Sequence, residues 1–241
     1  MIDTLMIFAA GKGTRMGALT QELPKPLISI AGMPILHHAL KNAIAYPFKK
    51  IVINSHHLAD QIQTSVEDFK SKHRHINLPE IIVIYEPELL ETGGAIKNAL
   101  NLLGDKPIFT LNSDVILKSG ISVFEYLNQQ WNPQIIDFLL LLQPFGKAVG
   151  YTGAGDFELT CDRQVSRIKT TRNYSYMYAG LSIVKPAMIA ENPAHVFSLK
   201  DYYLACEKVY GACMSEDSLK WYHATTPEDV VAIEQAISNV S

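Results

Sequence analysis

Apolar runs of strand length alternate with amphipathic stretches of helix length through the first half of the chain. Short apolar runs favour buried strands, and apolar residues spaced three or four apart favour helices that cover a sheet. The alternation therefore predicts βαβ units and a mostly parallel sheet. The expected strands are residues 5–9, 50–54, 81–85 and 107–111, and the expected helices are residues 34–46, 58–71 and 93–103. The near-continuous apolar run 135–142 predicts a strand that is buried on both faces.

The second half of the chain has a different pattern. Residues 156–160, 164–169 and 175–184 have the composition of shorter strands, which we expect to form a smaller antiparallel layer. A helix is expected near residues 199–210. A last helix is expected after Pro227, because Thr226 can cap it and Glu228 and Asp229 follow in its first turn. No Pro/Gly-rich linker and no internal repeat interrupts the chain, so we expect one domain over residues 1–241.

Composition narrows the class of protein. The chain has 241 residues, 48% of them hydrophobic and 19% charged, which is enough for a sizeable core. A net charge of −3 gives no basic field for nucleic acid. Cys161, Cys206 and Cys213 are too few and too irregularly spaced for a disulfide framework or a zinc site. No signal-type or membrane-length apolar segment is present, so we expect a soluble cytoplasmic protein with no membrane contact.

The first expected strand runs into a turn that contains two glycines. Gly11 and Gly13 let the backbone approach a ligand closely, and successive N–H groups in such a turn bind anions. Arg15 follows directly, and Lys25 stands between two prolines ten residues later. The third glycine of the dinucleotide fingerprint is replaced by Met16, and the spacing of a P-loop is absent. The turn is therefore interpreted as a triphosphate site of another kind, the alternative being an ordinary strand-to-helix loop.

The motifs of this region resemble those of the sugar-1-phosphate nucleotidyltransferases. The resemblance rests on Ala9-Ala10-Gly11-Lys12-Gly13-Thr14-Arg15-Met16, Pro24-Lys25-Pro26-Leu27, Ile30-Ala31-Gly32-Met33-Pro34, Glu91-Thr92-Gly93-Gly94 and Asn112-Ser113-Asp114. Within that family, the block that begins at Glu91 and the short chain most resemble the uridylyltransferases that act on N-acetylmuramate α-1-phosphate in cell-wall recycling.

The resemblance implies a fold and a division of the chain. The fold would be a Rossmann-like three-layer α/β sandwich of the nucleotide-diphospho-sugar transferase type, with a mostly parallel central sheet and a small sugar-facing β subregion. The nucleotide-binding half would span about residues 1–118 and the sugar-binding half about residues 119–241.

The reaction implied is attack of a sugar 1-phosphate oxygen on the α-phosphorus of a nucleoside triphosphate, with release of pyrophosphate. Both reactants are anions, so the site must neutralise charge and align the reacting oxygens. Arg15 is expected to hold the β- and γ-phosphates, and Lys25 to lie near the α-phosphate. The other residues expected to contact the nucleotide are Ala9, Ala10, Gly11, Gly13, Thr14, Asn54, Glu91, Thr92, Gly93 and Asn112.

Asp114 comes just after an expected strand, at the edge where ligands of α/β sheets bind. The resemblance implies that it binds Mg²⁺, with Mn²⁺ as the alternative metal, while a simple turn cap is the structural alternative. The family pattern places a second metal-binding aspartate near the C-terminus, where this chain has His223. Imidazole is a poorer ligand for Mg²⁺ than a carboxylate. Either the metal site works with Asp114 and the phosphates, or catalysis is impaired.

Three residues are candidates for the sugar side of the site: Asp156, Lys169 and Gly180. Gly180 stands within a strand-like run, where glycine often marks close approach of a ligand or of another backbone.

The sequence leaves three functions open. A uridylyltransferase that uses UTP is the leading interpretation, and a cytidylyl- or guanylyltransferase is the second. A nucleotide- or sugar-phosphate-binding protein with weak catalysis is the third, because of His223. The expected partners are small molecules alone, and the protein is expected to be a monomer or a homodimer.

Overall fold

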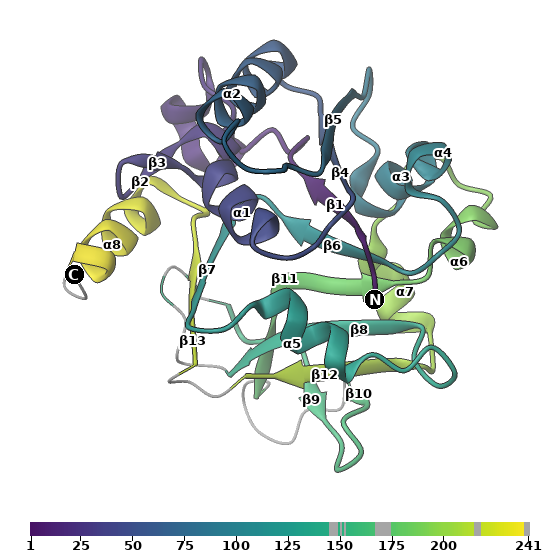
Figure 1. Cartoon of the computed structure of the whole chain (residues 1–241). Coiled ribbons are helices and arrows are strands. Elements are labelled where there is room, and N and C mark those ends of the chain that lie inside the picture. Colours follow the sequence, from purple (N-terminus) through teal and green to yellow (C-terminus); the bar gives the residue numbers. More distant parts are fainter. Residues whose placement is uncertain (145–148, 150, 152, 167–174, 215–217, 239–241) are drawn as a thin grey trace.

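A seven-stranded sheet forms the centre of the computed structural model, which describes residues 1–144, 149, 151, 153–166, 175–214 and 218–238 (Figure 1). The strand order is β12-β8-β11-β6-β1-β4-β5. All neighbouring pairs are parallel except the two that β11 makes with β6 and β8. The strands are β1 (Thr4–Phe8), β4 (Lys50–Ser55), β5 (Glu80–Tyr85), β6 (Ile108–Asn112), β8 (Phe138–Pro144), β11 (Tyr176–Val184) and β12 (Val209–Cys213).

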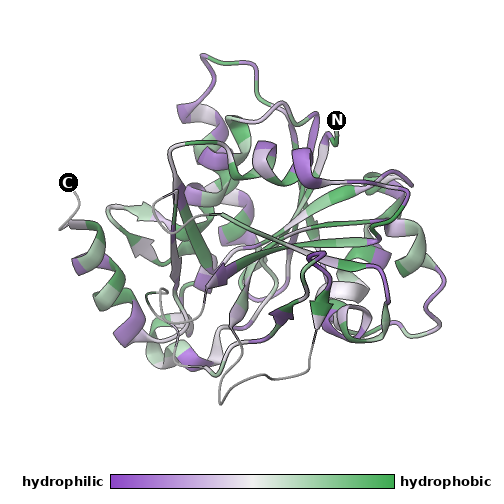
Figure 2. Ribbon diagram, turned by 90° about the horizontal axis from the view of Figure 1, so that it is seen from below, coloured by the Kyte–Doolittle hydropathy of each residue, from purple (hydrophilic) through white to green (hydrophobic). Residues whose placement is uncertain are grey.

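Alternating side chains of the central strands pack into two separate cores. In β1, Leu5 and Ile7 belong to one core and Met6 to the other, and all three are fully buried. This is the two-residue period of a strand covered on both faces. Figure 2 shows hydrophobic residues concentrated along these strands, with hydrophilic residues more frequent on the surrounding helices and turns.

Helices cover both faces of the sheet and make a three-layer sandwich. The first face is covered by α1 (Ile35–Ile44), α2 (Ala59–Lys72) and α5 (Val123–Gln130). The second is covered by α3 (Glu91–Asn98), α4 (Leu100–Leu103), α6 (Pro186–Ala190) and α7 (Leu199–Ala205). The predicted α/β sandwich with a mostly parallel sheet is therefore confirmed, and the four strands and the helices expected in the first half are present within a few residues. The one helix expected over 93–103 is divided into α3 and α4 at Ala99.

Two expectations for the second half are corrected. The strand expected over 175–184 does not lie in a separate antiparallel layer: β11 is inserted between β6 and β8 in the main sheet. Its residues Ala179 to Val184 are buried on both sides, which only a central strand allows. The small antiparallel pair is formed by β9 (Glu158–Leu159) and β10 (Val165–Ser166), and only a single antiparallel bridge between the described residues Phe157 and Tyr176 connects this region to β11. The helix expected near 199–210 ends at Ala205, because Val209 begins the edge strand β12.

A two-stranded ribbon that the sequence pattern did not predict joins the middle of the chain to its C-terminal part. It pairs β7 (Val115–Ser119) with β13 (Leu219–His223) in antiparallel register. The last helix, α8 (Pro227–Ser238), starts as predicted. Asp229 accepts hydrogen bonds from the N–H groups of Thr225 and Thr226, at 3.0 and 2.8 Å.

A third core joins α8 to the N-terminal loop. Ile233 of α8 packs with Met16, Ile30 and Tyr222, and all four are buried. The loop contains the turns η1 (Thr14–Thr20) and η2 (Lys25–Leu27) and the short hairpin of β2 (Ser29–Ile30) and β3 (Met33–Pro34). In Figure 1, α8 lies beside this hairpin.

Two further predictions concern the described part of the chain. Its helices are all too short or too polar to cross a membrane. The three cysteines are free thiols, as their spacing predicts.

Candidate functional site

A cavity of about 310 Å³ opens at the carboxyl ends of β1, β4 and β6. Most of the residues predicted to bind nucleotide or metal line it, although they come from five separate segments. They are Ala10, Gly11, Gly13, Thr14, Arg15, Lys25, Asn54, Glu91, Thr92, Asn112 and Asp114. Ala9 and Gly93 do not line this cavity, and neither do Asp156, Gly180 and His223.

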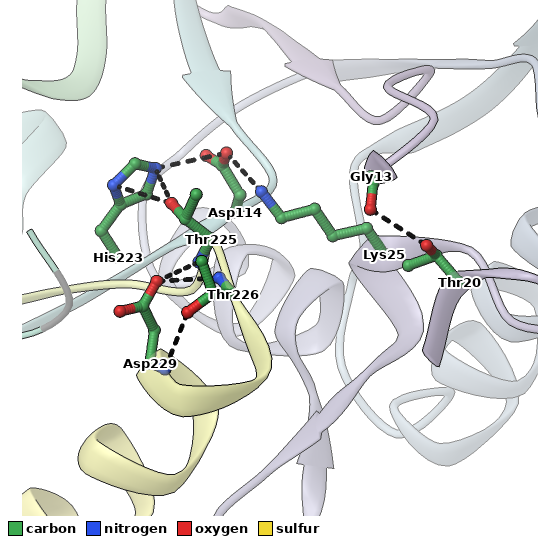
Figure 3. Close-up of polar contacts among 8 residues, drawn as sticks. All are labelled: Gly13, Thr20, Lys25, Asp114, His223, Thr225, Thr226 and Asp229. Atoms are coloured by element: carbon green, nitrogen blue, oxygen red, sulfur yellow. Dashed lines mark hydrogen bonds and ion pairs between the residues drawn. The ribbon is translucent and has the colours of Figure 1, made fainter. Parts of the chain in front are cut away.

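Gly11 and Gly13 of the two-glycine turn line this cavity. The N–H groups of Gly11, Lys12 and Gly13 have no hydrogen-bond acceptor among the described residues. Gly13 has a φ of +64°, and a Cβ there would lie 2.8 Å from the Cβ of Lys25. Glycine is thus required both for the backbone conformation and for contact with Lys25. Thr20 donates a 3.0 Å hydrogen bond to the Gly13 carbonyl, which holds the turn closed (Figure 3).

Lys25 and Asp114 form an ion pair at one end of the cavity. The Lys25 ammonium lies 2.8 Å from Asp114 Oδ2, although 89 residues separate them in sequence. Lys25 is only 9% exposed, so its charge is poorly solvated and is directed at this carboxylate. The sequence predicts both residues near the reacting phosphates, and the structure brings them into contact; Arg15 is an exposed residue of the cavity lining.

His223 contacts the same carboxylate from the opposite side. Its Nε2 lies 3.4 Å from Asp114 Oδ2, and the hydroxyl of Thr225 lies 3.2 Å from both ring nitrogens (Figure 3). The β7–β13 ribbon causes this approach, since its register pairs His223 with Val115, the residue after Asp114. Ala224 also donates to the Asp114 carbonyl at 3.0 Å.

The electrostatics of Asp114 reflect these two partners. Burial by itself would raise the pKa of this carboxyl. The hydrogen bond from His223 and the positive charge of Lys25 outweigh burial and hold the pKa well below its usual range. Asp114 is therefore ionised at neutral pH.

One oxygen of Asp114 is suited to a metal ion. Oδ1 is buried and has no hydrogen-bond partner among the described residues, whereas Oδ2 contacts Lys25 and His223. A carboxylate oxygen without a partner is the kind of ligand that Mg²⁺ prefers. Within the described residues, no group of three or more His, Cys, Asp or Glu side chains comes together, so phosphate oxygens and water would have to complete the coordination.

Asn54 forms a hydrogen bond to the backbone at the start of the glycine turn. Its Oδ1 accepts a 2.9 Å hydrogen bond from the N–H of Ala9, and its Nδ2 donates a 2.9 Å hydrogen bond to Glu86. Ala9 therefore contributes to the site through its backbone, behind the cavity wall.

The glycines that open α3 have partners of their own. The N–H groups of Gly93 and Gly94 donate to the Phe197 carbonyl at 2.9 and 3.1 Å, so they are not available to a base. A Cβ on Gly93 would collide with the Phe197 ring, which explains the glycine by packing. Glu91 and Thr92 do line the cavity, and Glu91 holds a φ of +62°, rare for a residue with a side chain.

Two residues predicted for the sugar side, Gly180 and Asp156, lie at and beside the bulge of β11 and outside the lining of the cavity. Gly180 has a φ of +82° at the bulge of β11, and a Cβ there would lie 3.1 Å from the Val115 methyls and 3.3 Å from Asn112 Cβ. Asp156 accepts a 3.0 Å hydrogen bond from the N–H of Tyr178 next to this bulge. Lys169 lies outside the described residues.

Sequence reasoning did not single out Ser113, which lines the cavity, or two polar residues that contact predicted ones. Thr225 lines the cavity and contacts His223, and Glu86 is fully buried behind Asn54. Thr225 follows the strand that ends at His223, and Glu86 follows the predicted strand 81–85. Polar residues directly after strands were the available signal.

The arrangement as a whole is suited to binding anions. The backbone of Gly11 and Gly13, the cationic side chains of Arg15 and Lys25, and the carboxylates of Glu91 and Asp114 line a cavity of about 310 Å³. Among the described lining residues there is no cysteine, and the one serine, Ser113, has no side-chain hydrogen bond to a histidine or a carboxylate. These groups suit a transfer between two bound phosphates.

Comparison with known proteins agrees with this geometry. The family model described as nucleotidyl transferase matches residues 4–141. The chain is 30% identical over 235 residues to N-acetylmuramate alpha-1-phosphate uridylyltransferase of Caulobacter vibrioides, covering 97% of this chain and 96% of that protein. It is 31% identical over 186 residues to the enzyme of the same name from Neisseria meningitidis serogroup B, covering 76% and 75%. The structure of HddC from Yersinia pseudotuberculosis complexed with GMP-PN superposes with a TM-score of 0.76, at 21% identity, over 98% of this chain and all of that one.

Proposed function

The chain belongs to the nucleotidyl transferase family and is a sugar-1-phosphate nucleotidyltransferase, and from this we propose that it transfers a uridylyl group from UTP to N-acetylmuramate α-1-phosphate. The observation that carries the proposal is one cavity lined by Lys25, Asp114, Gly11 and Gly13, in which the N–H groups of the two glycines have no acceptor among the described residues. The choice of base and sugar is supported by the names of the two relatives described above.

In the proposed mechanism, a phosphate oxygen of the sugar 1-phosphate attacks the α-phosphorus of UTP. The new P–O bond forms as the bond between the α-phosphorus and the β-phosphate oxygen breaks, and pyrophosphate leaves with that electron pair. The Gly11–Gly13 turn and Arg15 bind the β- and γ-phosphates, where negative charge increases. Lys25 neutralises charge between the two phosphates that react. A phosphate monoester is largely ionised near neutrality, so no strong base is needed.

Asp114 is the residue that would hold Mg²⁺, through its unpaired Oδ1. When bound, the ion would neutralise phosphate charge that Lys25 and Arg15 leave uncompensated. Lys25 and His223 keep the Asp114 carboxylate ionised and fixed in orientation for this purpose.

The first experiment is a pyrophosphate-release assay with Mg²⁺. UTP, CTP, GTP, ATP and dTTP are each tested against a panel of sugar 1-phosphates that includes N-acetylmuramate α-1-phosphate. The proposal expects release with UTP and N-acetylmuramate α-1-phosphate. Release only with CTP or GTP would make the protein a cytidylyl- or guanylyltransferase instead.

A second function is favoured by His223, which faces Asp114 where the family pattern has an aspartate. The protein would then bind nucleotide or sugar phosphate with impaired catalysis. In that case UTP binds without pyrophosphate release in Mg²⁺ or Mn²⁺, and His223→Asp raises turnover. If the wild-type protein turns over and His223→Asp does not increase its rate, this second function is wrong.

A further inference from the structure

Glu86 is a fully buried carboxyl that the proposed mechanism does not use. It follows β5 directly and belongs to none of the phosphate-binding or metal-binding groups. Removing a carboxyl from water is costly unless it gains hydrogen bonds. Only one of its oxygens does so, because Oε2 has no partner among the described residues.

The other oxygen holds the side chain of Asn54. Glu86 Oε1 accepts a 2.9 Å hydrogen bond from Asn54 Nδ2, and Asn54 Oδ1 accepts a 2.9 Å hydrogen bond from the N–H of Ala9. Asn54 is 3% exposed, so water does not compete for either end of its amide. An amide has an acceptor at one end and a donor at the other. Because Glu86 accepts a hydrogen bond from the NH₂ group of Asn54, the amide is oriented with its oxygen toward the N–H of Ala9.

The Ala9 N–H lies where the β1–β4 ladder ends. The last residue pair of the ladder is Phe8 with Asn54, and the chain then leaves β1 for the turn that contains Gly11 and Gly13. Beyond this pair, the Asn54 side chain accepts the hydrogen bond that a further strand residue would otherwise accept from Ala9. This contact fixes the direction in which the chain leaves β1 and enters the turn. The unpaired N–H groups of the turn can only converge on phosphate if that direction is held.

We infer that Glu86 is a positioning residue for nucleotide binding, which acts through the Asn54 amide and the Ala9 N–H to orient the phosphate-binding turn. The inference rests on the proposed binding of a nucleoside triphosphate at Gly11–Gly13. It assigns Glu86 no contact with the base.

The backbone around Glu86 is held independently of its side chain. Its N–H donates to the Ser55 carbonyl at 2.8 Å, and a ring nitrogen of His56 donates to its carbonyl at 2.8 Å. A substitution of the side chain therefore tests the hydrogen bond to Asn54 and leaves these backbone contacts in place. Burial raises the pKa of the Glu86 carboxyl, against the opposing hydrogen bond from Asn54, so a neutral glutamine suits the same surroundings.

The test compares Glu86→Met, which lacks the acceptor, with Glu86→Gln, which keeps it. Binding of UTP, CTP and inorganic tripolyphosphate to the full chain is measured by calorimetry, with melting temperature as the stability control. Glu86→Met should weaken binding of all three by about tenfold, the value of a hydrogen bond to a charged acceptor, and Glu86→Gln should bind within about threefold of wild type. In the steady state, Glu86→Met should raise KM for the nucleotide with kcat and KM for the sugar phosphate little changed.

A second variant, Asn54→Ala, removes the amide that connects Glu86 to the N–H of Ala9. It should weaken tripolyphosphate binding about as much as Glu86→Met, and the double variant should be no worse than either single one. If Glu86→Met does not fold, Asn54→Ala and Glu86→Gln carry the test. Unchanged tripolyphosphate binding in Asn54→Ala or Glu86→Met would overturn the inference, as would additive effects in the double variant.

Two other results separate this inference from neighbouring ones. Weaker binding of one nucleotide with unchanged tripolyphosphate binding would mean that Glu86 contacts the base, and the positioning role would be wrong. Absence of nucleotide and tripolyphosphate binding in the wild-type protein would overturn the proposed function itself, which is a different outcome from loss in the variants alone.

Discussion

Asp114 is the residue at which the charges of the site meet. Its carboxylate contacts Lys25 and His223 through one oxygen and leaves the other without a partner. Residues in such a cluster do not act independently, so the effect of a substitution depends on what remains beside it.

Asp114→Asn should lower turnover by about two orders of magnitude or more, because it removes the proposed metal ligand and leaves Lys25 without its counter-charge. Asparagine is close in shape, so the variant should still fold, but its melting temperature should fall because the buried Lys25 loses its ion pair. Pyrophosphate release and thermal unfolding measure the two effects. Full activity of the variant would contradict the assignment of Asp114 to the metal.

Glu86 gives a pH-dependent prediction for stability. Its pKa in the folded protein is raised above the usual 4.5, so the folded state binds this proton more tightly than the unfolded chain. Its contribution to stability is present below pH 4.5 and is lost as the pH rises through the raised pKa. The free energy of unfolding of Glu86→Gln, relative to wild type, should therefore increase from below pH 4.5 to neutrality in denaturant titrations. A difference that is constant with pH would contradict the raised pKa.

At the scale of elements, the contacts of the glycine turn with the rest of the fold show why each of its two glycines is needed. Gly13 needs a positive φ and touches the Lys25 side chain, whereas a Cβ on Gly11 would have no neighbour within 4 Å. The sequence marks both residues as glycines of one motif, yet the structure gives them different reasons to be glycine.

Gly13→Ala should destabilise the fold by about 1–2 kcal/mol or more, because alanine is strained at this φ and its Cβ would press on Lys25. Gly11→Ala is the matched control and should leave the free energy of unfolding nearly unchanged. Chemical denaturation of the two variants checks the difference. Equal stability of both would mean that the turn relaxes freely.

At the scale of the whole molecule, the two ends of the chain build one site together. The β7–β13 ribbon places His223 and Thr225 beside Asp114, and α8 packs under the N-terminal loop that carries Lys25. Glu234 of α8 also accepts a 2.7 Å hydrogen bond from the Ala31 N–H of that loop. The C-terminal helix therefore supports the N-terminal loop.

Ile233→Ala should cost about 2–5 kcal/mol of stability, because Ile233 is fully buried against Met16 and Ile30. It should also raise KM for the nucleotide, since the loop it supports carries Lys25. Val231→Ala, at a position 57% exposed on the same helix, is the control and should change stability by less than about 0.5 kcal/mol. Thermal unfolding and steady-state kinetics of the pair measure both effects. Similar behaviour of the two variants would mean that α8 does not support the loop.

The sequence by itself determined the features that depend on neighbours in the chain. The apolar runs at 5–9 and 50–54 predict strands of a mostly parallel sheet, the run at 135–142 predicts a strand buried on both faces, and the glycine turn, Arg15 and Lys25 predict an anion site at the end of the first strand. These signals are local, because hydrophobic period and turn chemistry are set within a few residues.

Only the tertiary structure decided which distant groups meet. The insertion of β11 between β6 and β8, the register that brings His223 to Asp114 across 109 residues, and the path from Glu86 through Asn54 to Ala9 all depend on strand order and register. A strand of suitable composition can pair with several neighbours with similar local free energy. The burial of apolar side chains in the complete sheet determines which pairing forms. For this reason the chemistry of the site was predictable from its motifs, whereas the partners that orient its residues were not.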